Sequence, residues 1–152
     1  MRSTPALSLD LDSQLCFALY DASRAVTRAY GPLLGELGLT YAQYITMLVL
    51  WEASGPLHVG AIGVRLHLDT STLTPLLKRL ESLGFLSRSR DPADERRVLI
   101  TLTTAGAELR DRATAIPYQI ASQLGLDRAA EERLRDTLRH ITHSLDSEQS
   151  SA

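Results

Sequence analysis

The sequence predicts a mainly helical fold with one small β-hairpin, and two observations indicate it. Two short helical patterns within residues 57–83 are joined by a turn of about three residues. Two segments that alternate polar and apolar residues follow at once, within 86–103. This order is typical of a winged helix-turn-helix, in which the second helix and the hairpin, called the wing, contact duplex DNA. Residues 57–103 are therefore the predicted DNA-binding region.

Residues 1–56 are expected to form N-terminal helices that serve dimerisation. Apolar side chains recur at helical spacing along the first of them: Leu15, Leu19, Ala22, Val26 and Ala29. A second helix should begin after Thr40, because Thr40 and Gln43 have the spacing of a capping box.

The helix pair of the DNA-binding region is defined by its apolar stripes. The first helix carries Val59, Ile62 and Leu66 on one face. The stripe of the second docks on the core: Leu73, Leu76, Leu77, Leu80 and Leu83. Its candidate N-caps are Asp69, Thr70, Ser71 and Thr72. Pro75 favours a late start, because proline fits only the first turn of a helix.

The opposite face of the second helix suits close approach to DNA. It carries small hydroxyls, a proline and two cations: Ser71, Thr74, Pro75, Lys78, Arg79 and Ser82. Bulky acids on this face would be repelled by phosphates, whereas hydroxyls and cations can contact phosphates and base edges.

The wing is expected after Gly84, with strands at 86–90 and 97–103. Val98, Ile100 and Leu102 form its buried side. The polar connection 91–96 should project as a loop that presents Arg96, with Arg97 behind it, to a minor groove. Asp94 is placed to brace the Arg96 guanidinium. For these residues alone, a solvated charged hairpin is the alternative interpretation.

Charge and composition agree with a small regulator. The chain has 152 residues and a net charge of −2, but the segment from Arg65 to Ile100 carries +2 and the remainder −4. Positive charge is thus concentrated where DNA would bind. No apolar run approaches the ~20 residues of a membrane span, and no signal peptide is recognised before Asp10, so we expect a cytoplasmic protein without membrane partners.

Residues 104–146 are expected to form C-terminal dimerisation helices, followed by a disordered tail at 147–152. One stripe is kinked by Pro117 and ends at Gly125: Leu109, Ala113, Ile116, Ile120 and Leu124. After Asp127 a last helix has the spacing of a packing seam: Leu134, Leu138, Ile141 and Leu145. A twofold homodimer would place two recognition helices about 34 Å apart on a near-palindrome. Completion of a monomer core is the alternative.

Cys16 is the only cysteine, so it makes no internal disulfide and no zinc cage. A position near a helix N-terminus favours the thiolate, whereas Asp12 one turn earlier opposes it. The thiol lies one step off the apolar stripe and should be partly buried. From these residues alone, a small core residue is the favoured interpretation.

Four motifs then carry a resemblance to a known family. They are QLCFALY (14–20), GLTYAQY (38–44), LTPLLKRLE (73–81) and DERR (94–97). Together they closely resemble the organic hydroperoxide resistance regulators of the MarR family, over residues 12 to about 106. The resemblance implies a MarR-type dimer and a repressor that binds palindromic operator DNA, with no enzyme activity and no cofactor.

In that subfamily an N-terminal cysteine thiolate is oxidised by an organic hydroperoxide, and the repressor dimer then leaves its operator. The resemblance assigns this redox-sensing role to Cys16 and makes 1–56 a sensor segment. It assigns support of the thiolate to Tyr30 and Tyr41 across the dimer, with Tyr20 close by. Phenolic donors stabilise a thiolate without blocking it.

The sequence departs from relatives that carry a second, resolving cysteine, since Ala121 and Ser122 lie in that region. A small thiol should then form a mixed disulfide with Cys16, unless the sulfur oxidises further.

The resemblance also places 69–83 in the major groove and Arg96 in the minor groove. The predicted DNA-binding residues are Ser71, Thr72, Thr74, Lys78, Arg79, Asp94, Arg96 and Arg97.

Three other functions compete with this interpretation. In the first, a MarR-type repressor is gated by a small aromatic ligand and Cys16 is incidental. In the second, the chain is a thiol peroxidase, but only Arg24 and Arg28 lie near Cys16 as polar helpers. In the third, His140 and His143 bind a metal, although they look like ordinary surface residues.

Overall fold

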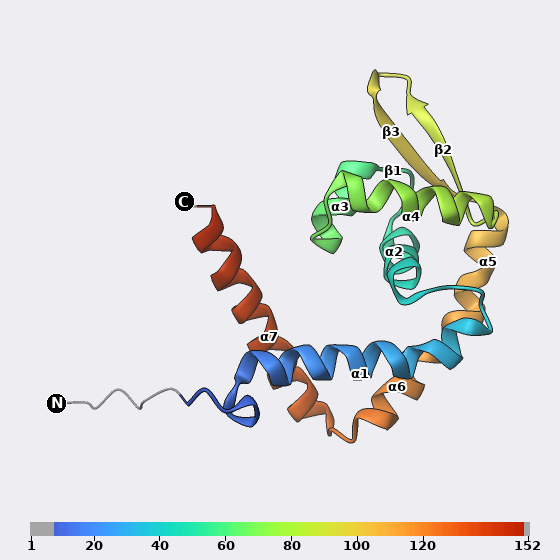
Figure 1. The fold of residues 1–152 in the computed structure, drawn as a ribbon. Coiled ribbons are helices and arrows are strands. Elements are labelled where there is room, and N and C mark those ends of the chain that lie inside the picture. Colours follow the sequence, from blue (N-terminus) through green and yellow to red (C-terminus); the bar gives the residue numbers. More distant parts are fainter. Residues whose placement is uncertain (1–7, 151–152) are drawn as a thin grey trace. The chain divides into compact units, whose positions relative to one another are not determined.

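A computed structural model describes residues 8–150 (Figure 1). The chain divides into two compact units between Thr114 and Ala115, which are described separately. The first unit contains η1 (Leu11–Ser13), α1 (Leu15–Gly35), α2 (Tyr41–Glu52), β1 (Leu57–His58), α3 (Val59–Leu66), α4 (Thr70–Ser82), β2 (Leu86–Asp91), β3 (Asp94–Leu102) and α5 (Thr104–Ala113). The second contains α6 (Ile116–Leu124) and α7 (Arg128–Gln149). The predicted mainly helical fold with a β-hairpin wing is confirmed.

The two N-terminal helices differ sharply in burial. The capping box at the start of α2 is present: the Gln43 backbone N–H donates to Thr40 Oγ1 at 3.3 Å, and the Thr40 backbone N–H donates to Gln43 Oε1 at 2.9 Å. Helix α2 lies at the centre of the core, with Met47 fully buried and Leu50 nearly so. Of the residues described in α1, only Leu34 is buried. Most of the surface of helix α1 is therefore left uncovered by residues 8–150.

The helix-turn-helix is closed by a left-handed residue and a close backbone approach. His67 ends α3 with φ 54°, and the Leu68 N–H donates to the Gly63 carbonyl at 3.0 Å. A Cβ at Gly63 would lie 2.7 Å from the Leu68 carbonyl oxygen, so a side chain there would push the turn away from α3.

Helix α4 begins earlier than Pro75 suggested. Asp69 is the N-cap, and its Oδ1 accepts from the Thr72 N–H at 2.7 Å. Pro75 lies inside the helix, so the prediction of a late start is wrong. Its ring is exposed, and the Ser71 carbonyl that loses an N–H partner also lies on the exposed side, where water can satisfy it. The Asp69 cap therefore decides the start.

The wing belongs to a three-stranded antiparallel sheet in the order β1-β3-β2. Strand β1 was not predicted, since it has only two residues and is defined by its pairing with Leu99 and Ile100 of β3. The expected loop at 91–96 is also corrected: Asp91 pairs with Asp94, and only Pro92 and Ala93 join the strands. Asp91 Oδ1 accepts from the Ala93 N–H at 2.9 Å, which tightens the turn.

Gly106 fixes α5 against Phe85, the residue just before β2. A Cβ at this position would lie 1.9 Å from the Phe85 carbonyl oxygen, so no side chain fits without a backbone shift. The Gly106 carbonyl also accepts a hydrogen bond from the Trp51 indole N–H at 2.8 Å, and this bond is buried. Helices α2 and α5 are thereby joined through one glycine.

The predicted kinked stripe is divided between two separate helices, α5 of the first unit and α6 of the second. Pro117 occupies the first turn of α6, so it begins a helix and kinks none. Gly125 ends α6 with φ 66°, and Asp127 caps α7 through the Ala130 N–H at 2.7 Å, both as expected.

Helix α7 exposes its apolar seam and is longer than predicted. No residue of α7 is buried, and the exposed side chains include Leu134, Leu138 and Leu145. The helix continues to Gln149, so residues 147–149 of the expected disordered tail are helical. The Ser147 hydroxyl donates a hydrogen bond to the His143 carbonyl at 2.8 Å, as serines within helices commonly do. Residues 151–152 lie outside the described part, as do 1–7.

Candidate DNA-binding surface and thiol site

Helix α4 buries one face and leaves the predicted reading face open. Leu73, Leu77 and Leu80 are at most 1% exposed, which docks the helix on the core. Thr72, Lys78 and Arg79 are exposed, as is Ser71, while Thr74 is half-buried. The Ser71 hydroxyl donates to Asp69 Oδ1 at 2.7 Å. This bond and the Thr72 amide lower the pKa of the Asp69 carboxyl, so it stays charged and holds the helix start.

The wing tip presents Arg96 almost completely to solvent. Its side chain is 95% exposed, and its Nε lies 3.7 Å from Asp94 Oδ1. The same oxygen accepts from the Arg96 N–H at 3.1 Å. Asp94 therefore lies near the guanidinium, but at a separation longer than a hydrogen bond, and its hydrogen bond is to the Arg96 backbone. On the other side, Arg90 donates to the Glu95 carbonyl at 2.8 Å, which ties the two strands together near the tip.

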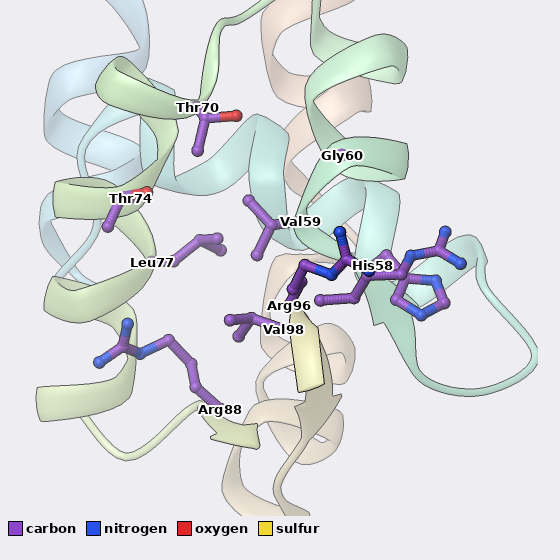
Figure 2. A pocket seen from close by; sticks show the side chains of 10 residues that line it. His58, Val59, Gly60, Thr70, Thr74, Leu77, Arg88, Arg96 and Val98 are labelled. Carbon is purple, nitrogen blue, oxygen red and sulfur yellow. The ribbon is translucent and has the colours of Figure 1, made fainter. Parts of the chain in front are cut away.

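A pocket of about 320 Å³ lies between α4 and the wing. Figure 2 shows Thr70 and Thr74 on one wall, His58 and Val59 on another, and Arg88 and Arg96 at the strands. The pocket joins the two predicted DNA-contacting elements into one basic surface. Thr70, Arg88 and His58 were not among the predicted site residues.

Arg88 is held by α4. Its Nε lies 2.9 Å from Glu81 Oε2, and its backbone N–H donates to Glu81 Oε1 at 3.1 Å. The Arg88 side chain, and then its backbone bond, lower the pKa of the Glu81 carboxyl. The pair therefore braces β2 against α4. The Glu81–Arg88 pair was hard to recognise in the sequence, since the two residues are seven positions apart and a turn separates them.

Cys16 is the second residue of α1, and its thiol is free and exposed. The prediction of partial burial is wrong for the single chain, because this end of α1 is not covered. Tyr20, one helical turn further on, is 60% exposed. The Arg24 guanidinium carbon lies 5.5 Å from the Tyr20 ring centroid, so the ring is covered by a cation on one side.

The other predicted tyrosines form a cluster at the far end of α1. The ring centroid of Tyr30 lies 4.8 Å from that of Tyr41 and 5.6 Å from that of Tyr44. Burial, and then the neighbouring phenols Tyr41 and Tyr44, raise the pKa of Tyr30 to about 12. Burial also raises the pKa of Tyr44. Tyr30 and Tyr44 therefore keep their phenolic protons and can donate hydrogen bonds. Tyr44 was missed, although it follows Tyr41 by one turn.

Cys16 and the tyrosine cluster are far apart within one chain. Cys16 and Tyr30 are on the same unbroken helix, fourteen residues apart. At 1.5 Å per residue this is about 21 Å along the axis. Tyr20 is not among the residues of the cluster. Any contact between the Cys16 thiol and the Tyr30 phenol therefore requires a second chain.

A metal-binding cluster and a membrane-spanning helix are both missing from residues 8–150. No group of three or more metal-ligating side chains occurs there, and His140 and His143 are both exposed on α7. No helix in the same range is long and apolar enough to cross a bilayer.

Comparison with known proteins identifies the class. Residues 28–113 match the family described as transcriptional regulator SarA/Rot. The organic hydroperoxide resistance transcriptional regulator of Bacillus subtilis is 47% identical over 84% of each chain. The structure of reduced AbfR bound to DNA has a TM-score of 0.76 at 34% identity and covers 90% of this chain and 93% of its own.

A further solved structure, a MarR-family transcriptional regulator from Rhodococcus sp. RHA1, has a TM-score of 0.78 at 27% identity and covers 88% of this chain and 96% of its own. The chain belongs to the MarR family of winged helix-turn-helix transcriptional regulators. Within that family its similarity to organic hydroperoxide resistance regulators, expected from the four motifs, is confirmed. Two of these three relatives are named as transcriptional regulators, the third is AbfR bound to DNA, and none is named as an enzyme.

Proposed function

We propose that this chain is a dimeric repressor that binds near-palindromic operator DNA while Cys16 is reduced. Oxidation of Cys16 by an organic hydroperoxide releases the repressor from this DNA. The observation that carries this proposal is an exposed thiol at one end of α1 and a cluster of tyrosines, among them the buried Tyr30 with its raised pKa, towards the other. The Bacillus subtilis relative named for organic hydroperoxide resistance supports it.

The dimer follows from the exposed face of α1. Leu15 is 67% exposed and Phe17 37%, and both present apolar surface that residues 8–150 leave uncovered; Tyr20, whose ring lies beside Arg24, is 60% exposed. In a twofold, antiparallel pairing of two α1 helices, residues equidistant from the centre face each other. A centre near Ser23 brings Cys16 opposite Tyr30 of the partner subunit, and Tyr41 lies against Tyr30. The exposed leucines of α7 supply further surface for a second copy.

The DNA contact uses α4 and the wing together. Thr72, Lys78 and Arg79, with Ser71 and Thr74, approach bases and phosphates in a major groove. Arg96 and Arg97 reach the adjacent minor groove, and Asp94 directs the Arg96 guanidinium. In the dimer, two such surfaces about one helical turn of DNA apart read the two halves of the operator.

The chemistry begins with attack by the Cys16 thiolate on a peroxide oxygen. The O–O bond breaks, the alkoxide takes a proton and leaves as an alcohol, and the sulfur becomes a sulfenic acid. Phenols from the partner subunit donate hydrogen bonds to the thiolate and bind the oxidised sulfur less well. A small thiol then displaces water from the sulfenic acid and forms a mixed disulfide, because the chain has no second cysteine. The changed contacts at the α1 pair release the DNA.

The test compares DNA release by the wild type and by Cys16→Ser, using duplex DNA from upstream of the gene for this chain. Each reduced protein is treated with an organic hydroperoxide, with and without a small thiol, and binding is followed by fluorescence anisotropy. We expect release of the wild type, retention of Cys16→Ser, and a mass gain of one thiol on the released wild type. Release of both proteins would instead favour a repressor gated by a small aromatic ligand. A dimer cross-linked through Cys16 would contradict the mixed disulfide.

A further inference from the structure

One hydrogen bond joins the two outer strands of the sheet across the middle strand. His58 Nε2 lies 2.7 Å from Asp91 Oδ2, with His58 on β1 and Asp91 at the end of β2. Because the strand order is β1-β3-β2, the two side chains meet over β3. Their side chains are 28% and 14% exposed, so the bond is partly shielded from water.

The His58–Asp91 bond connects the start of the helix-turn-helix to the tip of the wing. His58 is also the N-cap residue of α3. The other carboxylate oxygen of Asp91 holds the Ala93 N–H in the turn at the tip. The hydrogen bond from His58, followed by that from Ala93, lowers the pKa of Asp91, and Arg97 on β3 adds to the effect. The charged Asp91 side chain therefore links β1, the turn at the wing tip and β3.

The wing needs such a link because β1 supports only its base. Strand β1 pairs with Leu99 and Ile100, so the part of the hairpin beyond Leu99 has no third strand. The ladder of β2 and β3 is also shifted between Arg90 and Asp91. A two-stranded ribbon is marginally stable by itself, and ordering it on DNA would cost conformational entropy.

We propose that His58 is a positioning residue for DNA binding, which fixes the wing relative to α3 and α4 through Asp91. It sets where Arg96 and Arg97 stand while α4 occupies the major groove. This proposal rests on the proposed DNA-binding function. His58 touches no DNA in this role, and its effect passes through the wing.

A double-mutant cycle separates this role from general destabilisation. DNA affinity is measured for His58→Ala, Arg96→Ala, Lys78→Ala and the two doubles that contain His58→Ala, with the same upstream duplex. We expect His58→Ala to weaken binding about threefold to tenfold. Its loss should overlap with that of Arg96→Ala, so that the double mutant is weaker than Arg96→Ala by less than about twofold. The loss of affinity caused by His58→Ala should add fully to the loss caused by Lys78→Ala.

His58→Gln is the matched variant, because its amide can also donate to Asp91. It should recover most of the affinity, and thermal unfolding checks that each variant is folded. Amide exchange of Ala93 in the free protein should be faster in His58→Ala and close to wild type in His58→Gln. Additive losses for His58 and Arg96, or unchanged affinity in His58→Ala, would overturn the role of His58. If Arg96→Ala and Lys78→Ala both bind as the wild type does, the proposed DNA surface itself fails, and the positioning role with it.

Discussion

The DNA-binding region and α1 differ in where their apolar side chains find partners. From α2 to α5 most large apolar residues are covered within one chain, as Met47, Ile62, Leu73 and Ile100 show with no exposed surface, and Leu48 and Val64 are exceptions. Along α1, Leu15 and Tyr20 remain more than half exposed. The first region folds around its own core, whereas the second has an amphipathic helix without its counterpart. The Cys16 thiol lies on the uncovered helix α1. Its reactivity therefore depends on the surface that covers this helix.

The region from α2 to α5, most of whose apolar residues pack on one another, is called the self-contained region below. The largest expected effect tests how tightly this region is packed. Gly106→Ala places a Cβ against the Phe85 carbonyl oxygen and disturbs the carbonyl that binds Trp51. We expect a loss of about 3 kcal/mol in the free energy of unfolding, measured in urea. Gly60→Ala is the control, since nothing lies within 4 Å of its Cβ and alanine favours a helix. Equal stability of the two variants would show that the close approach at Gly106 is relieved without cost.

The next effect tests whether α1 is completed by a second copy. Phe17→Glu puts a charge on the surface that the proposed dimer buries, and the dissociation constant of the dimer should rise by about thirtyfold or more, about 2 kcal/mol. Analytical ultracentrifugation gives the constant. Val64→Glu is matched to it, because Val64 is 77% exposed on α3, outside the proposed interface. A Phe17→Glu protein that dimerises as tightly as Val64→Glu would move the interface away from this face of α1.

A smaller effect concerns the DNA contact of the self-contained region. Arg96→Ala removes a cation of the wing whose side chain is 95% exposed and should weaken DNA binding about tenfold, about 1.4 kcal/mol, with a shallower dependence on salt. Arg128→Ala is the control: this arginine is 92% exposed and pairs with Glu132 on α7. Equal affinities of both variants for the upstream duplex would remove Arg96 from the DNA surface.

The same contrast explains what could be predicted from the sequence. Apolar stripes identified the helix pair because both partners of each contact belong to the chain, as with Leu73 and Leu77 in α4. Strand β1 and the His58–Asp91 bond went unnoticed, since two residues carry no periodicity and the bond joins positions 33 apart. Pro75 was misread because its cost depends on exposure, which is a tertiary property. The exposure of Cys16 could not follow from helix periodicity, because in the proposed dimer the surface that covers this thiol belongs to the second copy.

The smallest expected effect is a pH dependence of the self-contained region. The pKa of Asp91 is lowered by His58 and Ala93, so its charged form stabilises the folded wing. A carboxyl with a lowered folded pKa contributes stability above its unfolded pKa of 3.8 and loses it as the pH falls through the folded value. Between about pH 5 and about pH 3 the melting temperature of the wild type should fall further than that of Asp91→Asn, which has no proton to gain. Parallel curves for the two proteins would mean that Asp91 titrates alike in both states. His58 would then hold the wing by a bond too weak to bias its position, and α4 would position the wing through Glu81 and Arg88 alone.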